Sequence, residues 1–379
     1  MYVATWTEET GWQEGGLRPY GPLELLPSAQ VLNYGQAIFE GMKALRPEGG
    51  GAAAAAVTAA AGGGNGNGNG NGNGAASKEQ QQDADRIVLF RPDRNAARMA
   101  AGAERMAMPP VPADLFIAAV ERTVRANAGF VPPAGKGSFY LRPLLLGTGP
   151  ILGLGPAPSF TFAVFGAAVG AYFKGGQLAP ISLLVEERFH RSAPRGMGGT
   201  KAAGNYSPVL PSQLAAKRAG FSDVAYLDAR HDRYLEEVSS CNLFCVRGRK
   251  ITTPPLAGSI LPGVTRASVI ELARARGYEV AEEAVDVDTA MESADELFTT
   301  GTAVGVCSVG SLTYKGRKRR FAGGGGGAAG AAAAAAGGAE RGAEEEGPGP
   351  VALEIYEALT GLQTGRRPDD FGWVHPVPL

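Results

Sequence analysis

The sequence predicts an α+β protein of two domains, on three observations. At 379 residues, the chain exceeds the length at which a single hydrophobic core usually stops growing. Its apolar runs are mostly short and rich in Val, Leu, Phe and Tyr, which is typical of strands, and only a few segments have helical spacing. A Gly- and Pro-rich passage, GAAVGAYFKGGQLAP, lies near the middle and is typical of a link between domains. We predict a smaller first domain (1–172), a linker (173–180) and a larger second domain (181–379).

Two low-complexity insertions interrupt this pattern. Residues 48–85 run through poly-Ala and an Asn-Gly repeat, and residues 322–350 are rich in Ala, Gly and Glu. Such compositions bury too little apolar surface to offset the entropy lost on ordering. The flanks of the first insertion, AIFEGMKALR and RIVLFRP, alternate like strands, so this insertion is predicted to replace a hairpin turn.

The regular elements follow in order along the chain. In the first domain, Pro92 and Asp93 are typical of a helix start, and Phe116, Val120 and Val124 share one face of a second helix. Helices are also predicted in LPGVTRASVIELARARG and VALEIYEALTGLQ. Strands are predicted in GSFYLRPLLLG, SFTFAVFGAAV, ISLLVEERF, DVAYLDA, NLFCVRG, KITTP, EVAEEAV and ELFTTGTAVGVCSVGSLTY.

Composition limits the class of partner. Lys and Arg total 36 against 37 Asp and Glu, which argues against nucleic acid and favours a small molecule. The basic run at 315–320 is interpreted as a solvated hairpin end. No apolar run has the length of a membrane span, and the N-terminus lacks a secretory signal pattern. Cys241, Cys245 and Cys307 cannot all pair and lack zinc-like spacing, so we expect a reducing compartment and no metal site.

The run GGTKAAGNY and the later EVSSCNLF suggest pyridoxal-phosphate chemistry. Lys201 lies among small residues that let a ligand approach, and a lysine that is at times neutral can attack the cofactor aldehyde. The cofactor ring is an electron sink that works best with a protonated nitrogen, and a nearby carboxylate favours that cation. Glu237 is the candidate for this carboxylate, with Glu236 on the opposite face of a strand.

The cofactor phosphate also needs donors. The loop before the helix in LPGVTRASVIELARARG exposes the amides of Gly263, Val264 and Thr265, and Arg98 could complete the site. Each feature has an ordinary alternative: a solvated loop lysine, a charged turn, or stop-start punctuation before a helix. The residues alone leave these alternatives open.

Several blocks, taken in order, decide between them. The chain resembles the branched-chain amino acid aminotransferases of the D-amino-acid-aminotransferase-like fold (fold type IV), and most closely their long plant-like form. The similarity covers nearly all of the chain outside the two insertions. It is carried by LNYGQAIFEGMKALR, LFRPDRNAARM, KGSFYLRPLLLG, APSFTFAVFGAAVGAYF, GGTKAAGNY, YLEEVSSCNLF, ILPGVTRASVIELAR and TGTAVGV.

The resemblance implies pyridoxal 5'-phosphate as cofactor and gives each cofactor residue a role. Lys201 would bond to the cofactor covalently and, once released, move the substrate Cα proton. Tyr206 would hydrogen-bond the phenolate oxygen of the cofactor, and Glu237 would face its ring nitrogen. The phosphate would be held by Arg98, Thr302 and the amides of Val264 and Thr265. Arg191 matches a family arginine near the cofactor.

The resemblance also implies a substrate pocket with apolar walls and a polar rim. The predicted aromatic wall is Tyr34, Phe39 and Tyr172. Tyr140 and Arg142 match a clamp for the glutamate side-chain carboxylate, and the Thr302 and Ala303 amides would bind the α-carboxylate. Leu152 and Leu154 match a loop that reaches the pocket of a neighbouring subunit, which implies a homodimer.

The implied reaction is reversible transamination of L-leucine, L-isoleucine and L-valine with 2-oxoglutarate. A D-amino-acid transaminase, an aminodeoxychorismate-type lyase and a catalytically inactive binding relative are the alternatives. The Cys-x-x-Cys pair of animal-like members is incomplete here, since Val304 stands before Cys307, so no thiol switch is predicted. A plastid location is expected from the plant-like resemblance, with the mitochondrion or cytoplasm as alternatives. The chain begins inside the usual N-terminal region of the family, which leaves room for a preceding transit segment.

Overall fold

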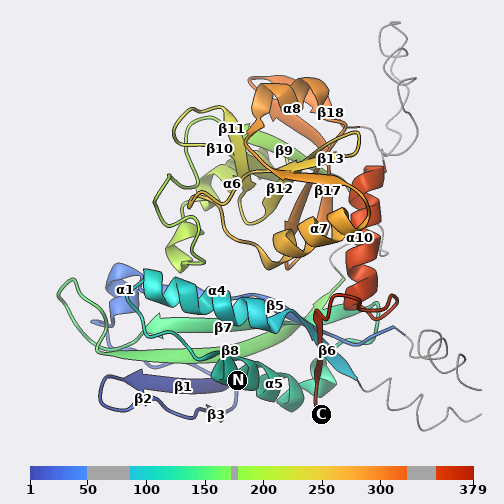
Figure 1. Ribbon diagram of the computed structural model, residues 1–379. Helices are drawn as coiled ribbons and strands as arrows, with labels where there is room; N and C mark the ends of the chain where they lie inside the picture. Colours follow the sequence, from blue (N-terminus) through green and yellow to red (C-terminus); the bar gives the residue numbers. More distant parts are fainter. Residues whose placement is uncertain (49–85, 172–177, 322–346) are drawn as a thin grey trace, which may run out of the picture.

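The computed structural model describes residues 1–48, 86–171, 178–321 and 347–379. Two sheets with their helices form two units, one above the other in Figure 1. The interiors of both predicted insertions, most of the predicted linker, and Tyr172 lie outside the described residues. The α+β fold class is confirmed.

The first unit contains a nine-stranded sheet among the described residues. Its order is β19-β6-β5-β7-β8-β1-β2, with β3 beside β1 and β4 beside β7, and all pairings are antiparallel. Its strands are β1 (Tyr2–Thr7), β2 (Gly11–Trp12), β3 (Gly16–Leu17), β4 (Ala37–Phe39), β5 (Met42–Leu45), β6 (Ile87–Phe90), β7 (Gly137–Gly147), β8 (Ser159–Gly170) and β19 (Val374–Val377).

Three helices accompany this sheet: α1 (Gln30–Tyr34), α4 (Pro92–Arg105) and α5 (Ala113–Ala126). The predicted helix start at Pro92 is confirmed. The predicted face of α5 is also confirmed, because Phe116, Val120 and Val124 are fully buried in the core of this unit. Helix α4 lies between the first sheet and the second unit (Figure 1), so its outward side chains face the other unit.

The second unit contains a ten-stranded sheet among the described residues. Its order is β14-β13-β12-β16-β17-β9-β10-β11-β15, with β18 beside β17. Strand β9 runs parallel to both β10 and β17. Its strands are β9 (Ile181–Glu186), β10 (Asp223–Leu227), β11 (Tyr234–Val238), β12 (Asn242–Arg247), β13 (Lys250–Thr253), β14 (Glu279–Glu282), β15 (Val285–Asp286), β16 (Glu296–Gly301), β17 (Gly305–Tyr314) and β18 (Arg317–Arg320).

Both faces of the second sheet are buried. The helices of this unit are α6 (Leu210–Arg218), α7 (Val264–Ala275), α8 (Val287–Ser293) and α10 (Pro350–Gln363). Side chains alternate along a strand, so Leu243 packs in the core that includes α8, whereas the next residue, Phe244, packs in the core of α7 and α10. This explains why β12 reads as a continuous apolar run rather than an alternating one.

The two flanks of the first insertion pair with each other. Ala44 lies opposite Leu89, and Leu45 opposite Val88, in antiparallel register, so the predicted hairpin flanks are confirmed. The last strand, β19, pairs with β6 in the first sheet. The end of the predicted second domain therefore joins the first sheet, while the predicted boundaries at 172 and 181 stay predictions. No helix in the described ranges has both the length and the apolar character needed to cross a bilayer.

Candidate active site

A cavity of about 550 Å³ lies where the two units meet. The first unit contributes Phe39, Gly41, Tyr140 and Arg142. The second unit contributes Ile181, Lys201, Tyr206, Ser222, Asp223, Val238, Ser240, Cys241, Thr299, Gly301, Thr302, Ala303, Val304 and Cys307. The structure thus gathers several residues that were predicted from separate motifs around one space.

Lys201 is held in this cavity by the first unit. Its carbonyl oxygen accepts a hydrogen bond from the Phe39 amide at 3.1 Å, and the neighbouring Ala202 forms an antiparallel bridge with Ile38. The Lys201 Nζ donates to the Tyr206 hydroxyl at 3.2 Å and lies 4.7 Å from the centre of the Phe39 ring. Burial, and then the positive charge of Arg98, lower the pKa of Lys201 to about 8. A sizeable neutral fraction near pH 8 follows.

The ring of Tyr206 packs against Phe39, and its hydroxyl bonds Lys201. Its ring meets Phe39 edge to face, with centroids 5.0 Å apart. Burial raises the pKa of Tyr206 to about 12, although the Arg191 charge acts in the opposite direction. The hydroxyl is therefore protonated at neutral pH and can donate a hydrogen bond to an oxygen anion.

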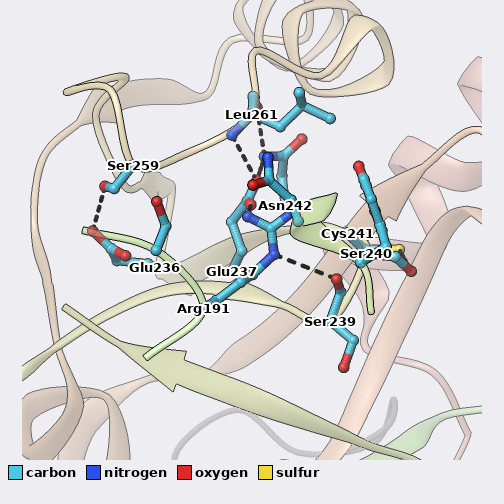
Figure 2. A network of polar contacts seen from close by, with 12 residues as sticks. Arg191, Glu236, Glu237, Ser239, Ser240, Cys241, Asn242, Ser259 and Leu261 are labelled. Atoms are coloured by element: carbon cyan, nitrogen blue, oxygen red, sulfur yellow. Dashed lines mark hydrogen bonds and ion pairs between the residues drawn. The ribbon is translucent and has the colours of Figure 1, made fainter. Parts of the chain in front are cut away.

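Glu237 lies on β11 at the centre of a buried polar network (Figure 2). Its Oε1 accepts hydrogen bonds from Asn242 Nδ2 at 2.5 Å and from the Leu261 amide at 3.1 Å. Its Oε2 forms an ion pair with Arg191 Nη1 at 2.5 Å, and both side chains are 3% exposed. Burial raises the pKa of Glu237 to about 7, against the lowering effect of Arg191. A further cation beside Oε2 would favour the ionised form.

Glu236 and Glu237 lie on opposite faces of β11. Glu236 accepts a hydrogen bond from the Ser259 hydroxyl, away from Glu237 (Figure 2), so the predicted opposite orientation is confirmed. Arg191 donates to the Ser239 carbonyl at 3.3 Å and lies 5.8 Å from the Tyr206 ring. Arg191 and Glu237 therefore lie together near Tyr206.

The start of α7 faces Arg98 on α4. The predicted helix is confirmed. It begins at Val264 with Gly263 as its N-cap, and its first amides have no acceptor within the helix. Only glycine fits at position 263, because a Cβ there would lie 2.1 Å from Asn242 Oδ1. Arg98 Nη1 donates to the Pro262 carbonyl at 3.0 Å, immediately before this helix start. Arg98, Gly263 and Val264 line one cavity, next to the main one.

Thr302 connects this region to the main cavity. It lines the main cavity, and with Val264 and Thr265 it also lines a small neighbouring one. The turn at Thr302 and Ala303 joins β16 to β17. From the first unit, Lys43 Nζ donates to the Ala303 carbonyl at 2.7 Å, which fixes the orientation of this peptide group.

Tyr140 and Arg142 extend from β7 into the cavity. The Arg142 guanidinium lies 4.7 Å from the centre of the Phe39 ring and 5.7 Å from that of Tyr140. A Cβ on Gly41 would lie 2.2 Å from the Tyr140 hydroxyl. Glycine at position 41 therefore lets this hydroxyl approach the backbone.

Three predicted substrate residues lie outside the cavity of this chain. The Tyr34 hydroxyl donates to the Leu152 carbonyl at 3.1 Å, so Tyr34 lies with the loop that carries Leu152 and Leu154. The last two side chains are 77% and 86% exposed. Their predicted contact with a neighbouring subunit stays a prediction.

Two cysteines line the cavity, Cys241 and Cys307. Burial raises the pKa of each thiol to about 12. Both are protonated and weakly nucleophilic at neutral pH.

Sequence reasoning missed four polar residues that support the site: Glu40, Lys43, Asn95 and Asn242. Glu40 and Lys43 stand inside the quoted block AIFEGMKALR, and Asn242 inside EVSSCNLF. For Glu40 and Lys43 the available signal was a charged residue within an apolar strand pattern, since buried charges require partners. The partners of Glu40 and Lys43 are distant in sequence and could not be identified from it.

The chain is similar in sequence to known aminotransferases. Residues 84–312 match the family model described as amino-transferase class IV. The chain is 45% identical over 373 residues to the chloroplastic branched-chain-amino-acid aminotransferase 5 of Arabidopsis thaliana, covering 98% of this chain and 76% of that protein. It is 43% identical over 374 residues to the mitochondrial branched-chain amino acid aminotransferase 1 of Humulus lupulus, covering 99% and 80%.

A solved structure supports the same fold. The branched-chain amino acid aminotransferase of Escherichia coli superposes with a TM-score of 0.70 at 23% identity. The match covers 100% of this chain and 99% of that one. The predicted fold type IV architecture is therefore confirmed.

Proposed function

Because this chain belongs to the class IV aminotransferases, and within them to the branched-chain-amino-acid aminotransferases, we propose that its inter-unit cavity binds pyridoxal 5'-phosphate on Lys201. The class of reaction, transamination of branched-chain amino acids, follows from the family. We further propose 2-oxoglutarate as the amino-group acceptor. The observation that carries the proposal is the juxtaposition of Lys201, Tyr206 and Arg142 around one cavity.

The residues present fit this cofactor. Glu237 Oε1 already accepts two hydrogen bonds, whereas Oε2, although ion-paired with Arg191, accepts none from the described residues. An acceptor in this state suits a protonated ring nitrogen. Arg98 and the first amides of α7 suit a phosphate group, because a helix start and a guanidinium both favour anions. Lys201, with its lowered pKa, suits an aldehyde.

Bound pyridoxal phosphate would supply an electron sink that stabilises negative charge at the substrate Cα. The remaining work falls to side chains of this protein. The Lys201 amine, when neutral, accepts the Cα proton at Nζ and delivers it again on the return step. Tyr206 keeps its proton on Oη and would donate a hydrogen bond to the phenolate oxygen of the cofactor. Glu237 would stabilise the positive charge of the protonated ring nitrogen. Asn242 and the Leu261 amide keep its carboxylate oriented.

Substrate selection is proposed to depend on the rim of the cavity. Phe39 and the apolar groups around it would contact an aliphatic side chain. Arg142 would pair with the distal carboxylate of glutamate or 2-oxoglutarate when that substrate is bound. The amides at Thr302 and Ala303, with the Ala303 carbonyl held by Lys43, would bind the α-carboxylate.

We propose that the protein is a homodimer. The exposed apolar side chains Leu152 and Leu154, next to Tyr34, support this, because contiguous exposed apolar surface commonly marks an interface. The chloroplastic and mitochondrial names of the relatives support a location in an organelle, with the plastid favoured by the first of them.

A coupled assay tests the function. Purified protein with pyridoxal phosphate, L-leucine and 2-oxoglutarate should produce glutamate, and L-isoleucine and L-valine should replace L-leucine. Activity with D-alanine in place of the L-amino acids would indicate the D-specific alternative. Activity as a lyase on aminodeoxychorismate would indicate the second alternative. Binding of cofactor without turnover of any amino acid would indicate the inactive relative.

A further inference from the structure

Glu40 is a fully buried carboxylate that directly contacts Arg98. Arg98 Nε donates to Glu40 Oε1 at 2.7 Å, and Arg98 Nη2 donates to Oε2 at 2.6 Å. Asn95 Nδ2 and the Gly41 amide also donate to Oε2, at 2.8 Å and 3.3 Å. The Glu40 side chain is 0% exposed and that of Arg98 10%. Planar bidentate pairing of this kind fixes the orientation of a guanidinium as well as its position.

The pair determines which part of the guanidinium is free. A guanidinium carries five N–H groups. Glu40 takes one on Nε and one on Nη2, and the Pro262 carbonyl takes one on Nη1. Among the described residues, this leaves one N–H on Nη1 and one on Nη2. Nη1 and Nη2 form the tip of the side chain, and the Nη1 contact with Pro262 places that tip beside the start of α7.

We propose that Glu40 is a positioning residue that holds Arg98 so that its two remaining N–H groups face the helix start as a receptor for the cofactor phosphate. This inference rests on the proposed cofactor and adds Glu40 to the residues of the proposed phosphate site. Since the Glu40 side chain is fully enclosed and its four hydrogen-bond donors all belong to the protein, it acts through Arg98.

Charge gives a second reason for this role. Without Glu40, the Arg98 cation would lie buried beside Lys201, whose pKa it lowers, whereas the Glu40 carboxylate raises that pKa. The other charged groups that act on Lys201 are Arg142, which lowers the pKa, and Glu237, which raises it. A neutral residue at position 40 would therefore misorient Arg98 and leave its charge unbalanced, and an isolated buried charge is costly.

The test compares two ligands that differ only in the phosphate. Full-length protein freed of cofactor is titrated with pyridoxal phosphate and, separately, with pyridoxal, and each Kd is read from the absorbance change. Glu40→Gln should raise the Kd for pyridoxal phosphate by ~10–100-fold, by analogy with residues that orient metal ligands, whose removal weakens binding by that factor. The Kd for pyridoxal, which lacks the phosphate and responds only to the altered charge near Lys201, should change much less. Glu40→Asp, which keeps the charge, should recover part of the affinity.

Two further variants sharpen the result. Glu236→Gln is the matched control, because Glu236 is a partly buried carboxylate that bonds Ser259 away from Arg98, and it should leave both Kd values unchanged. In an Arg98→Gln background, Glu40→Gln should raise the Kd for pyridoxal phosphate no further, since residues acting through one another are not additive.

The contradicting outcomes are distinct. If Glu40→Gln weakens pyridoxal and pyridoxal phosphate equally, Glu40 supports the fold and not the phosphate site, and the inference fails. If it weakens neither, Arg98 needs no such partner, and the inference fails as well. Failure of the unsubstituted protein to bind pyridoxal phosphate would instead remove the proposed function.

Discussion

The Lys201 amine lies 3.2 Å from the Tyr206 hydroxyl, in a cavity that neither unit forms alone. Lys201 and Tyr206 belong to the second unit, while Phe39, from the first unit, contacts both: its ring lies 4.7 Å from Nζ and meets the Tyr206 ring at 5.0 Å. The first unit therefore provides an apolar wall against which the reactive amine is desolvated, and desolvation is the largest cause of its lowered pKa.

The stability of the cofactor-free protein should depend on Lys201 at alkaline pH. Its folded-state pKa is about 8 against 10.5 for the free group, so between these values the unfolded chain binds more protons and stability rises with pH. The difference corresponds to about 3 kcal/mol. Chemical denaturation of the protein and of Lys201→Met, from pH 7 to 10.5, measures this: the stability of the unsubstituted protein should gain on that of the variant as pH rises. Parallel curves would show that the amine is not desolvated.

Replacing Glu237 with Gln should reduce kcat without loss of the fold. The amide cannot balance the positive charge of a protonated ring nitrogen, and losing one preorganised electrostatic contact in an active site costs ~10²–10³-fold in rate. Steady-state kinetics checks the rate, and the thermal midpoint checks the fold. Asn242→Ala should have a smaller effect, because the Leu261 amide still holds Oε1. Equal kcat for Glu237→Gln and the unsubstituted protein would contradict the proposed role.

Replacing Arg142 with Met should separate the two half-reactions. The KM for 2-oxoglutarate should rise by about tenfold or more, because a hydrogen bond to a charged group contributes ~1.5–3 kcal/mol, while the KM for L-leucine changes little. Initial rates at varied concentrations of each substrate give both constants. An equal rise in both would mean that Arg142 shapes the whole cavity rather than recognising the distal carboxylate.

Lys43→Met should raise the KM for amino acids and 2-oxo acids together. The Ala303 carbonyl would lose the donor that holds it at 2.7 Å, and the neighbouring amides would lose their fixed direction. Lys250→Met, in an exposed pair with Glu283, is a control that should leave kinetics unchanged. A variant at position 43 with unchanged KM values would show that the turn is held by other contacts.

Local elements could be read from the sequence because their signals are local. Pro92 marks the start of α4, and the alternating flanks of the first insertion pair as β5 and β6. Strand β19 was missed, since VHPV carries a histidine and a proline and lies in a sheet whose other strands are hundreds of residues away. Pairing partners at such separation leave no local pattern.

The candidate site was predicted in part for the same reason. Lys201, Tyr206 and the start of α7 stand in distinctive runs, whereas the ion pair of Arg191 with Glu237 and that of Glu40 with Arg98 join segments distant in the chain. Glu40 and Asn242 gave no signal beyond being polar residues in apolar surroundings. Resemblance supplied the roles that spacing could not.

The assignment of Lys201 is tested by the absorbance spectrum of the purified protein with pyridoxal phosphate, before and after L-leucine, beside that of Lys201→Ala. We expect a visible band in the unsubstituted protein that moves to the ultraviolet with L-leucine and returns with 2-oxoglutarate, and no such band in Lys201→Ala. An unsubstituted protein without the band, or a variant that shows the band and full turnover, would contradict the assignment.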